Sequence, residues 1–130
     1  MKRELMGRVI RQGTARGMAL VSREPVGFLG GVDPESGIVV ESGHDLQGQS
    51  VSGRILVFPT GKGSTVGSYT LYWMARSGTA PAAIINAESE AIVAVGAIIA
   101  GIPMVDQVDL SQIENGDCVE VSGNKVIVER

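Results

Sequence analysis

The chain has 130 residues, of which 44% are hydrophobic and 19% charged, which predicts one folded domain spanning residues 1–130 and excludes a disordered chain. The net charge is −3 and Lys and Arg form no cluster, so we expect no nucleic-acid partner. A single cysteine, Cys118, excludes an internal disulfide, and also excludes a structural zinc or iron–sulfur cluster held by this chain alone.

The first third of the chain predicts short strands separated by glycine. Apolar and β-branched residues favour strands over Leu5–Ile10, Met18–Val21 and Gly37–Glu41. Between the last two, Val32–Gly37 has the composition of a turn, because Pro34 fixes φ and Gly37 permits positive φ.

The middle of the chain predicts alternating strands and helices. Arg54–Phe58 and Ala82–Asn86 are compact apolar strands, and Ser68–Ser77 between them favours a helix. A second helix is expected over Glu90–Ala100, with Ser89 as its N-cap. This order is a βαβα unit, in which the two strands pair in parallel.

The second predicted helix is strongly apolar. Residues 92–99 are apolar on every side, so we expect most of this helix to be buried. The apolar run Ala91–Val105 is too short for a membrane span and Pro103 interrupts it. No long apolar segment follows Met1–Glu4, so we expect no secretory leader, no membrane partner and a cytoplasmic location.

The last residues predict a β-hairpin. Val119 and Val121 alternate with polar residues, as do Val126 and Val128, and Ser122–Lys125 between them fits a tight two-residue turn. The fold class is therefore α/β, with a β-rich shell around a βαβα centre that contains a parallel strand pair.

The segment Phe58–Ser68 carries the most chemical information. It leaves a strand and enters a helix, where unpaired N–H groups carry partial positive charge, so it favours binding of a small anion, either carboxylate or phosphate. It is not a P-loop, because Gly63 follows Lys62 where Ser or Thr is required. It also departs from the dinucleotide-binding fingerprint, because Val66 occupies the position where that motif requires its third glycine. A glycine-rich turn without a ligand stays an alternative.

Ser64 has a further chemical role open to it. A serine hydroxyl acts as a base only when its alkoxide is stabilised, and a helix N-terminus, nearby N–H groups and a cation would do this together. All three lie within local reach of Ser64, with Lys62 as the cation. We therefore predict Ser64 as the catalytic residue and Gly61, Lys62, Gly63 and Thr65 as substrate-binding residues.

A series of short motifs in a fixed order resembles the small subunit of the aconitase X family. The series covers roughly residues 15–106, and its ordered set is more specific than any one piece. In chain order the motifs are Gly30-Gly31-Val32-Asp33, His44-Asp45-Leu46-Gln47-Gly48, Gly53-Arg54-Ile55-Leu56, Gly61-Lys62-Gly63-Ser64-Thr65, Ala80-Pro81-Ala82-Ala83-Ile84-Ile85, Gly96-Ala97-Ile98 and Ile102-Pro103-Met104-Val105.

The resemblance implies a swivelling β/β/α domain and a dehydratase made of two chains. The family's proton-accepting serine corresponds to Ser64, and its large subunit carries the 4Fe-4S cluster, so this chain is expected to form a heterodimer and to bind no cofactor or metal itself. Archaeal members dehydrate (R)-5-phosphomevalonate to trans-anhydromevalonate 5-phosphate in isoprenoid synthesis. Other members dehydrate cis-3-hydroxyproline, which stays the alternative substrate. Lys62 and Thr65 replace the more usual Arg and Ser of the loop.

Several other side chains have both a functional and a structural interpretation. His44, the only histidine, has a catalytic or a structural reading. Tyr69, Tyr72 and Trp73 share the first predicted helix, where contact with the core or with another subunit is the default. A non-catalytic phosphohistidine carrier is the competing class of function, but such a carrier needs a histidine at the loop–helix junction, where this chain has Ser64.

Overall fold

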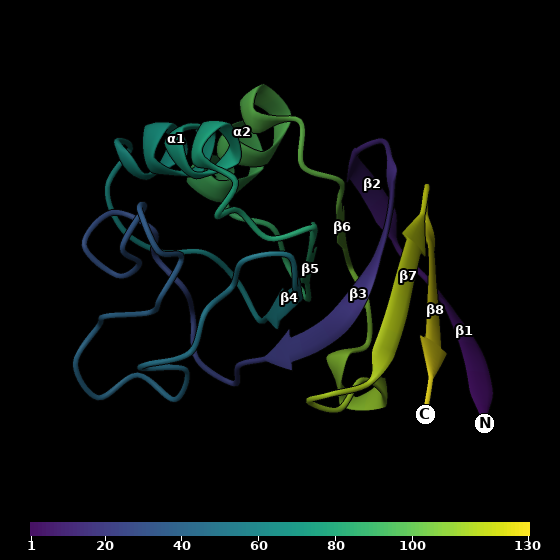
Figure 1. Ribbon diagram of the computed structural model, residues 1–130. Coiled ribbons are helices and arrows are strands. Elements are labelled where there is room, and N and C mark those ends of the chain that lie inside the picture. The colour runs from purple at the N-terminus through teal and green to yellow at the C-terminus, as the bar shows by residue number, and fades with distance from the viewer.

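The computed structural model describes residues 1–130, and it contains an eight-stranded mixed sheet with two α-helices packed on one side (Figure 1). The strand order is β1-β8-β7-β3-β4-β5-β6-β2. The elements in chain order are β1 (Lys2–Met6), β2 (Arg8–Arg11), β3 (Thr14–Val21), β4 (Ile55–Phe58), α1 (Gly67–Ser77), β5 (Ala83–Asn86), α2 (Ala91–Ala100), β6 (Met104–Asp106), the 3₁₀ turn η1 (Leu110–Gln112), β7 (Cys118–Ser122) and β8 (Lys125–Glu129).

The middle of the sheet is parallel. Strands β4 and β5 pair in register from Ile55 opposite Ala83 to Phe58 opposite Asn86, which confirms the predicted parallel pair. Strands β3 and β6 extend the parallel region on either side, and the sequence had not indicated this role for them. Every residue of β4 and β5 is buried, because both faces of the parallel region are covered.

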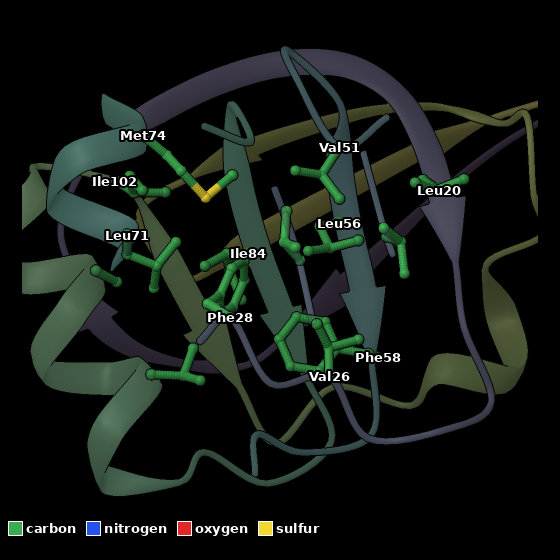
Figure 2. Close-up of a cluster of buried hydrophobic side chains, with 14 of the residues drawn as sticks. Leu20, Val26, Phe28, Val51, Leu56, Phe58, Leu71, Met74, Ile84 and Ile102 are labelled. Atoms are coloured by element: carbon green, nitrogen blue, oxygen red, sulfur yellow. The ribbon is translucent and has the colours of Figure 1, made fainter. Parts of the chain in front are cut away.

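The covering of both faces gives three layers. Leu56 and Phe58 of β4 point to the helices and join a core with Leu71 of α1, which Figure 2 shows in close-up. Ile55 and Val57 point to the other face and pack against valines of β7 and β8. Strand β3 belongs to both the parallel and the antiparallel region, so the sheet folds over on itself. The result is the expected β/β/α arrangement.

The antiparallel region contains one confirmed prediction and one error. Strands β7 and β8 form the predicted hairpin, with Ser122 paired to Lys125. The single strand predicted over Leu5–Ile10 is wrong, because Gly7 divides it into β1 and β2, which lie at opposite edges of the sheet. A Cβ at Gly7 would lie 2.4 Å from Val105 Cγ1 and 2.6 Å from the Asp106 carbonyl oxygen, so close packing against β6 requires glycine there.

Two further local predictions are wrong. Gly37–Glu41 forms no strand and makes only isolated bridges, Val39 with Val32 and Ile38 with Ser50. The N-cap of α2 is Glu90 and not Ser89, because the Glu90 carboxylate accepts hydrogen bonds from the N–H groups of Ile92 and Val93. A carboxylate in this position also offsets the positive end of the helix dipole.

Helix α2 is much more exposed than its composition predicted. Only Val93, Gly96 and Ala97 of its ten residues are buried, whereas Val95, Ile98 and Ile99 are between 44% and 51% exposed. The expectation that most of its surface is buried is therefore wrong for this chain by itself. Neither helix has the length and the apolar character together that crossing a membrane would require.

Candidate active site

The predicted loop follows β4 at the carboxyl edge of the parallel strands, where α/β proteins commonly bind ligands. Pro59, which directly follows β4, is held by the two residues after β5, because the Pro59 carbonyl accepts hydrogen bonds from the N–H groups of Ala87 (3.1 Å) and Glu88 (3.0 Å). The Asn86 amide donates to the Phe58 carbonyl at 2.9 Å. The loop therefore starts from a rigid position between two buried strands.

The middle of the loop is held by a segment far away in sequence. The Val26 N–H donates to the Thr60 carbonyl (3.3 Å) and the Lys62 N–H donates to the Val26 carbonyl (3.2 Å). Gly61 is buried there, and a Cβ at this position would lie 2.5 Å from Val93 Cγ2. The structure thus places Gly61 against α2, with glycine required by close packing.

The exposed end of the loop carries Ser64. Gly63 has φ of +106°, a conformation that glycine adopts without strain, and it turns the chain outward. The Val66 N–H then donates to Ser64 Oγ at 3.3 Å, and the Gly67 N–H donates to the Ser64 carbonyl at 2.9 Å. Ser64 therefore lies in the turn just before α1, whose N-cap is Val66 and whose first N–H groups donate no hydrogen bond to a capping side chain.

The electrostatic surroundings of Ser64 are positive at the backbone. The first turn of α1 contains no acidic residue of its own to offset the positive end of its dipole. The predicted cation, Lys62, is not free: its Nζ lies 2.7 Å from the Glu41 carboxylate. Both side chains of this pair are partly exposed, so an incoming anion can compete with Glu41 for the lysine.

His44 supports the loop from a distance. Its ring is buried, its Nε2 donates to the Pro25 carbonyl (2.9 Å), and its Nδ1 accepts from the Leu46 N–H (3.1 Å). Because a carbonyl can only accept, the ring carries its proton on Nε2, and both nitrogens are used. His44 thereby fixes Pro25, next to the Val26 that pairs with the loop, and the structural reading of this histidine fits its contacts.

Glu24, His44 and Asp45 lie close enough together to suggest a metal site. Their atoms are already engaged: Asp45 accepts from the Ser22 hydroxyl (2.7 Å) and the Arg23 N–H (2.9 Å). Burial raises the pKa of Asp45, but these hydrogen bonds outweigh it and hold the pKa of that carboxyl below its usual range. The cluster joins two loops through hydrogen bonds and presents no open set of ligands.

The chain offers no ligand set for a metal cluster near Ser64. Its single thiol, Cys118, lies half-buried on β7, where it pairs with Met18 of β3, and the loop itself contains no sulfur or imidazole ligand. Four ligands of these kinds are the usual requirement for an iron–sulfur cluster. What the loop can do chemically is bind an anion and hold or accept a proton at Ser64 Oγ.

The loop is not enclosed by this chain. Lys62, Gly63, Ser64 and Thr65 are all exposed. A polar hollow beside Pro59 has none of the predicted site residues in its lining, whereas Thr65 lines an apolar groove between α1 and α2. The structure therefore brings Lys62, Gly63, Ser64 and Thr65 together on one protruding turn and leaves Gly61 underneath it.

Sequence reasoning missed three residues that shape this loop. Val26 pairs with it, Glu41 binds Lys62, and Glu90 caps the helix on which Gly61 rests. Each comes from a segment distant in sequence or assigned another role, so no local pattern pointed to it.

Comparison with known proteins identifies the class. Residues 4–130 match the family described as "Aconitase X swivel domain", and the chain belongs to this family. The expected family and the β/β/α fold class are thereby confirmed. A solved structure of aconitase X from Thermococcus kodakaraensis, in its holo-form, superposes with a TM-score of 0.96 at 52% identity, covering 98% of this chain and 99% of that one.

Two curated relatives are similar over nearly their whole length. The chain is 54% identical to a protein of Methanosarcina acetivorans over 129 residues, which is 97% of this chain and 90% of the relative. It is 55% identical to a protein of Pyrococcus furiosus over 126 residues, which is 97% of this chain and 94% of the relative. Both relatives are named phosphomevalonate dehydratase small subunit.

Proposed function

We propose that this chain is the small subunit of a hydro-lyase that dehydrates (R)-5-phosphomevalonate to trans-anhydromevalonate 5-phosphate. The names of relatives at 54% and 55% identity, matched over nearly the whole chain, support the reaction and the two-subunit organisation. The observation that carries the local assignment is the exposed Ser64, whose Oγ accepts the Val66 N–H at the entry to α1.

Ser64 acts as the base in this proposal. Its alkoxide takes the proton from the carbon beside the substrate carboxylate, and the electron pair of that C–H bond forms the new double bond. The hydroxyl on the next carbon departs as hydroxide, which then takes up the proton held by Ser64 to give water and restore the alkoxide. The Val66 N–H and the positive end of α1 stabilise the negative charge on Oγ, and so favour the alkoxide.

The same turn holds the anionic substrate. Gly63 and Thr65 flank Ser64 on the exposed turn, where Gly63 offers its backbone N–H and Thr65 its hydroxyl to the substrate. Lys62 supplies a cation, which releases Glu41 and binds an anionic group of the substrate in its place. Gly61 contributes through its packing beneath the turn, which keeps the loop at a fixed height over α2.

The proposal divides the chemistry between two chains. This chain supplies the base and part of the anion site, while the large subunit holds a 4Fe-4S cluster. That cluster would supply the Lewis acid for the departing hydroxyl. The donor set of this chain fits the division, because its only thiol lies on β7 and not in the loop.

The direct test is reconstitution with the large subunit from the same organism under anaerobic conditions. (R)-5-Phosphomevalonate and cis-3-hydroxyproline are each supplied to the complex and to each chain alone, and the complex without either substrate is the blank. We expect dehydration of phosphomevalonate by the complex only. Turnover of hydroxyproline with none of phosphomevalonate would move the chain to the other substrate class of the family, and turnover by this chain alone would refute the two-subunit assignment.

A further inference from the structure

The two helices present an apolar face to solvent. Helix α2 contains no polar side chain, yet Val95, Ile98 and Ile99 are 49%, 51% and 44% exposed. A helix that is apolar all round is normally covered on every side. The uncovered side of α2 is therefore a surface that its sequence has adapted to burial, although nothing in this chain buries it.

Helix α1 continues the same face. Val66, Tyr69 and Trp73 follow one another at spacings of three and four residues, so they lie along one side of the helix, and each is between 48% and 69% exposed. The sequence predicts these aromatic side chains either in the core or in a contact with another subunit. Because they are exposed, they do not belong to the core, and the subunit contact is the alternative that fits. We call this surface the apolar face; it consists of Val66, Tyr69, Trp73, Val95, Ile98 and Ile99.

The apolar face is rigidly built. Gly96 lets α1 approach closely, because a Cβ there would lie 2.8 Å from Leu71 Cδ1 and 3.1 Å from the Ser68 Cα. The Ser68 hydroxyl donates to the Ile92 carbonyl at 2.9 Å. A groove between the helices is lined mainly by Val66, Tyr69, Ile92, Val95 and Ile99. Preformed apolar grooves of this kind bind partners with little loss of conformational entropy.

The apolar face joins the candidate active site without a break. Thr65 and Val66 line the groove, and Thr65 directly follows Ser64. The turn that carries Ser64 is exposed, so a substrate held there must be enclosed by another molecule. A partner that encloses Ser64 and also covers Thr65 and Val66 lies against the apolar face.

We propose that the apolar face is the surface that docks the large subunit, and that this contact carries the turn with Ser64 into the shared active site. The inference rests on the proposed two-subunit function. The large chain is the expected partner because relatives matched over nearly their full length are named small subunits. A second copy of this chain would cover the face without completing the site. The lack of charge on α2 suits a permanent contact, whose centre is depleted of charged residues.

The test measures association of the purified large subunit with variants of this chain. Val95→Glu and Ile99→Glu place a charge in the groove, and both side chains are already about half exposed, so the fold should persist. The matched control is Met18→Glu on β3, where a similarly exposed apolar side chain (55%) lies outside the apolar face. Unchanged thermal unfolding of each isolated variant establishes that the fold is retained.

We expect the groove variants to weaken the affinity by more than about 100-fold, since central interface positions dominate binding, while the control stays within about threefold of the unchanged chain. Titration calorimetry or size-exclusion chromatography reads this without any turnover. If all three variants bind the large subunit with equal affinity, or if the groove variants change only the self-association of this chain, the apolar face is not the docking surface for the large subunit. Failure of the proposed function is a separate result: a complex that forms normally but does not dehydrate phosphomevalonate.

Discussion

Lys62 has two competing partners, the carboxylate of Glu41 and the anionic substrate. Its Nζ lies 2.7 Å from Glu41, and the two side chains are 44% and 32% exposed, so the pair is weak enough to exchange. Glu41→Gln should therefore lower KM by about 2- to 5-fold at low salt with kcat unchanged. Glu35→Gln, an exposed acid in another turn, is the matched control for net charge. Steady-state kinetics of the complex measure both variants. The same KM for Glu41→Gln and Glu35→Gln would contradict the idea that the substrate displaces Glu41 from Lys62.

Asp106 is a buried carboxylate that depends on its partners. It is fully buried and accepts from Arg8 Nε (3.0 Å), Arg8 Nη2 (2.7 Å) and the Ser89 N–H (3.1 Å), which joins the edge strand β2 to the turn before α2. Burial raises its pKa, but these hydrogen bonds outweigh burial and hold the pKa below the ordinary value of 3.8.

A depressed pKa makes the stabilisation by Asp106 dependent on pH. Its contribution is fully present above the unfolded pKa near 3.8 and is lost as pH falls through the lower folded pKa. Asp106→Asn should reduce the free energy of unfolding by roughly 1.5–3 kcal/mol at pH 7, and the difference should shrink below about pH 4. Urea unfolding at pH 7 and pH 3 measures this. A difference that is the same at both pH values would contradict the charged pairing.

At the scale of elements, the turn between β4 and α1 depends on a positive φ at Gly63. This φ is +106°, and an added Cβ would meet only Gly27 Cα at 3.9 Å, so Gly63→Ala introduces strain without a clash. Gly48→Ala is the matched control, because Gly48 has φ of +87° and open space around it. Both variants should lower the free energy of unfolding by about 1–2 kcal/mol, but only Gly63→Ala should lower kcat of the complex. Equal kcat values would show that the turn need not hold this shape.

The sequence was most informative about elements where local signals agree. The buried strands β4 and β5 and both helices were predicted within one residue of their observed bounds, and the hairpin β7–β8 was predicted from its alternating valines and its turn, because apolar runs and turn residues coincide there. Gly37–Glu41 has the composition of a strand but finds no partner to form a ladder, and pairing is a long-range event. The apolar composition of α2 predicts burial but does not show which chain provides it, so the exposure of α2 within this chain could not be predicted.

At the scale of the whole molecule, the sheet begins with β1 and ends with β2, which only Gly7 separates in sequence. A local pattern gives no sign of this, because both segments read as one strand. The candidate site shows the same limit. The turn that carries Ser64 was predicted from glycine, lysine and hydroxyl residues in order, whereas Val26 and Glu41 are brought to it only by the fold.

The division of chemistry between two chains makes a prediction for the isolated molecule. Because one cysteine cannot ligate a cluster, this chain purified alone should be colourless, free of iron and inactive. Absorption spectra and metal analysis, before and after anaerobic mixing with the large subunit, measure this. Stoichiometric iron on the isolated chain would contradict the division.

Ser64→Ala in the reconstituted complex tests the central assignment most directly. Removing the hydroxyl should lower kcat by about 10²–10⁴-fold, the usual weight of a general base, while substrate affinity and stability stay nearly unchanged because the turn and Lys62 remain. Ser77→Ala, which removes an exposed hydroxyl at the other end of α1, should leave kcat intact. If Ser64→Ala keeps a near-normal kcat, the base lies elsewhere and the turn serves only to bind the anion.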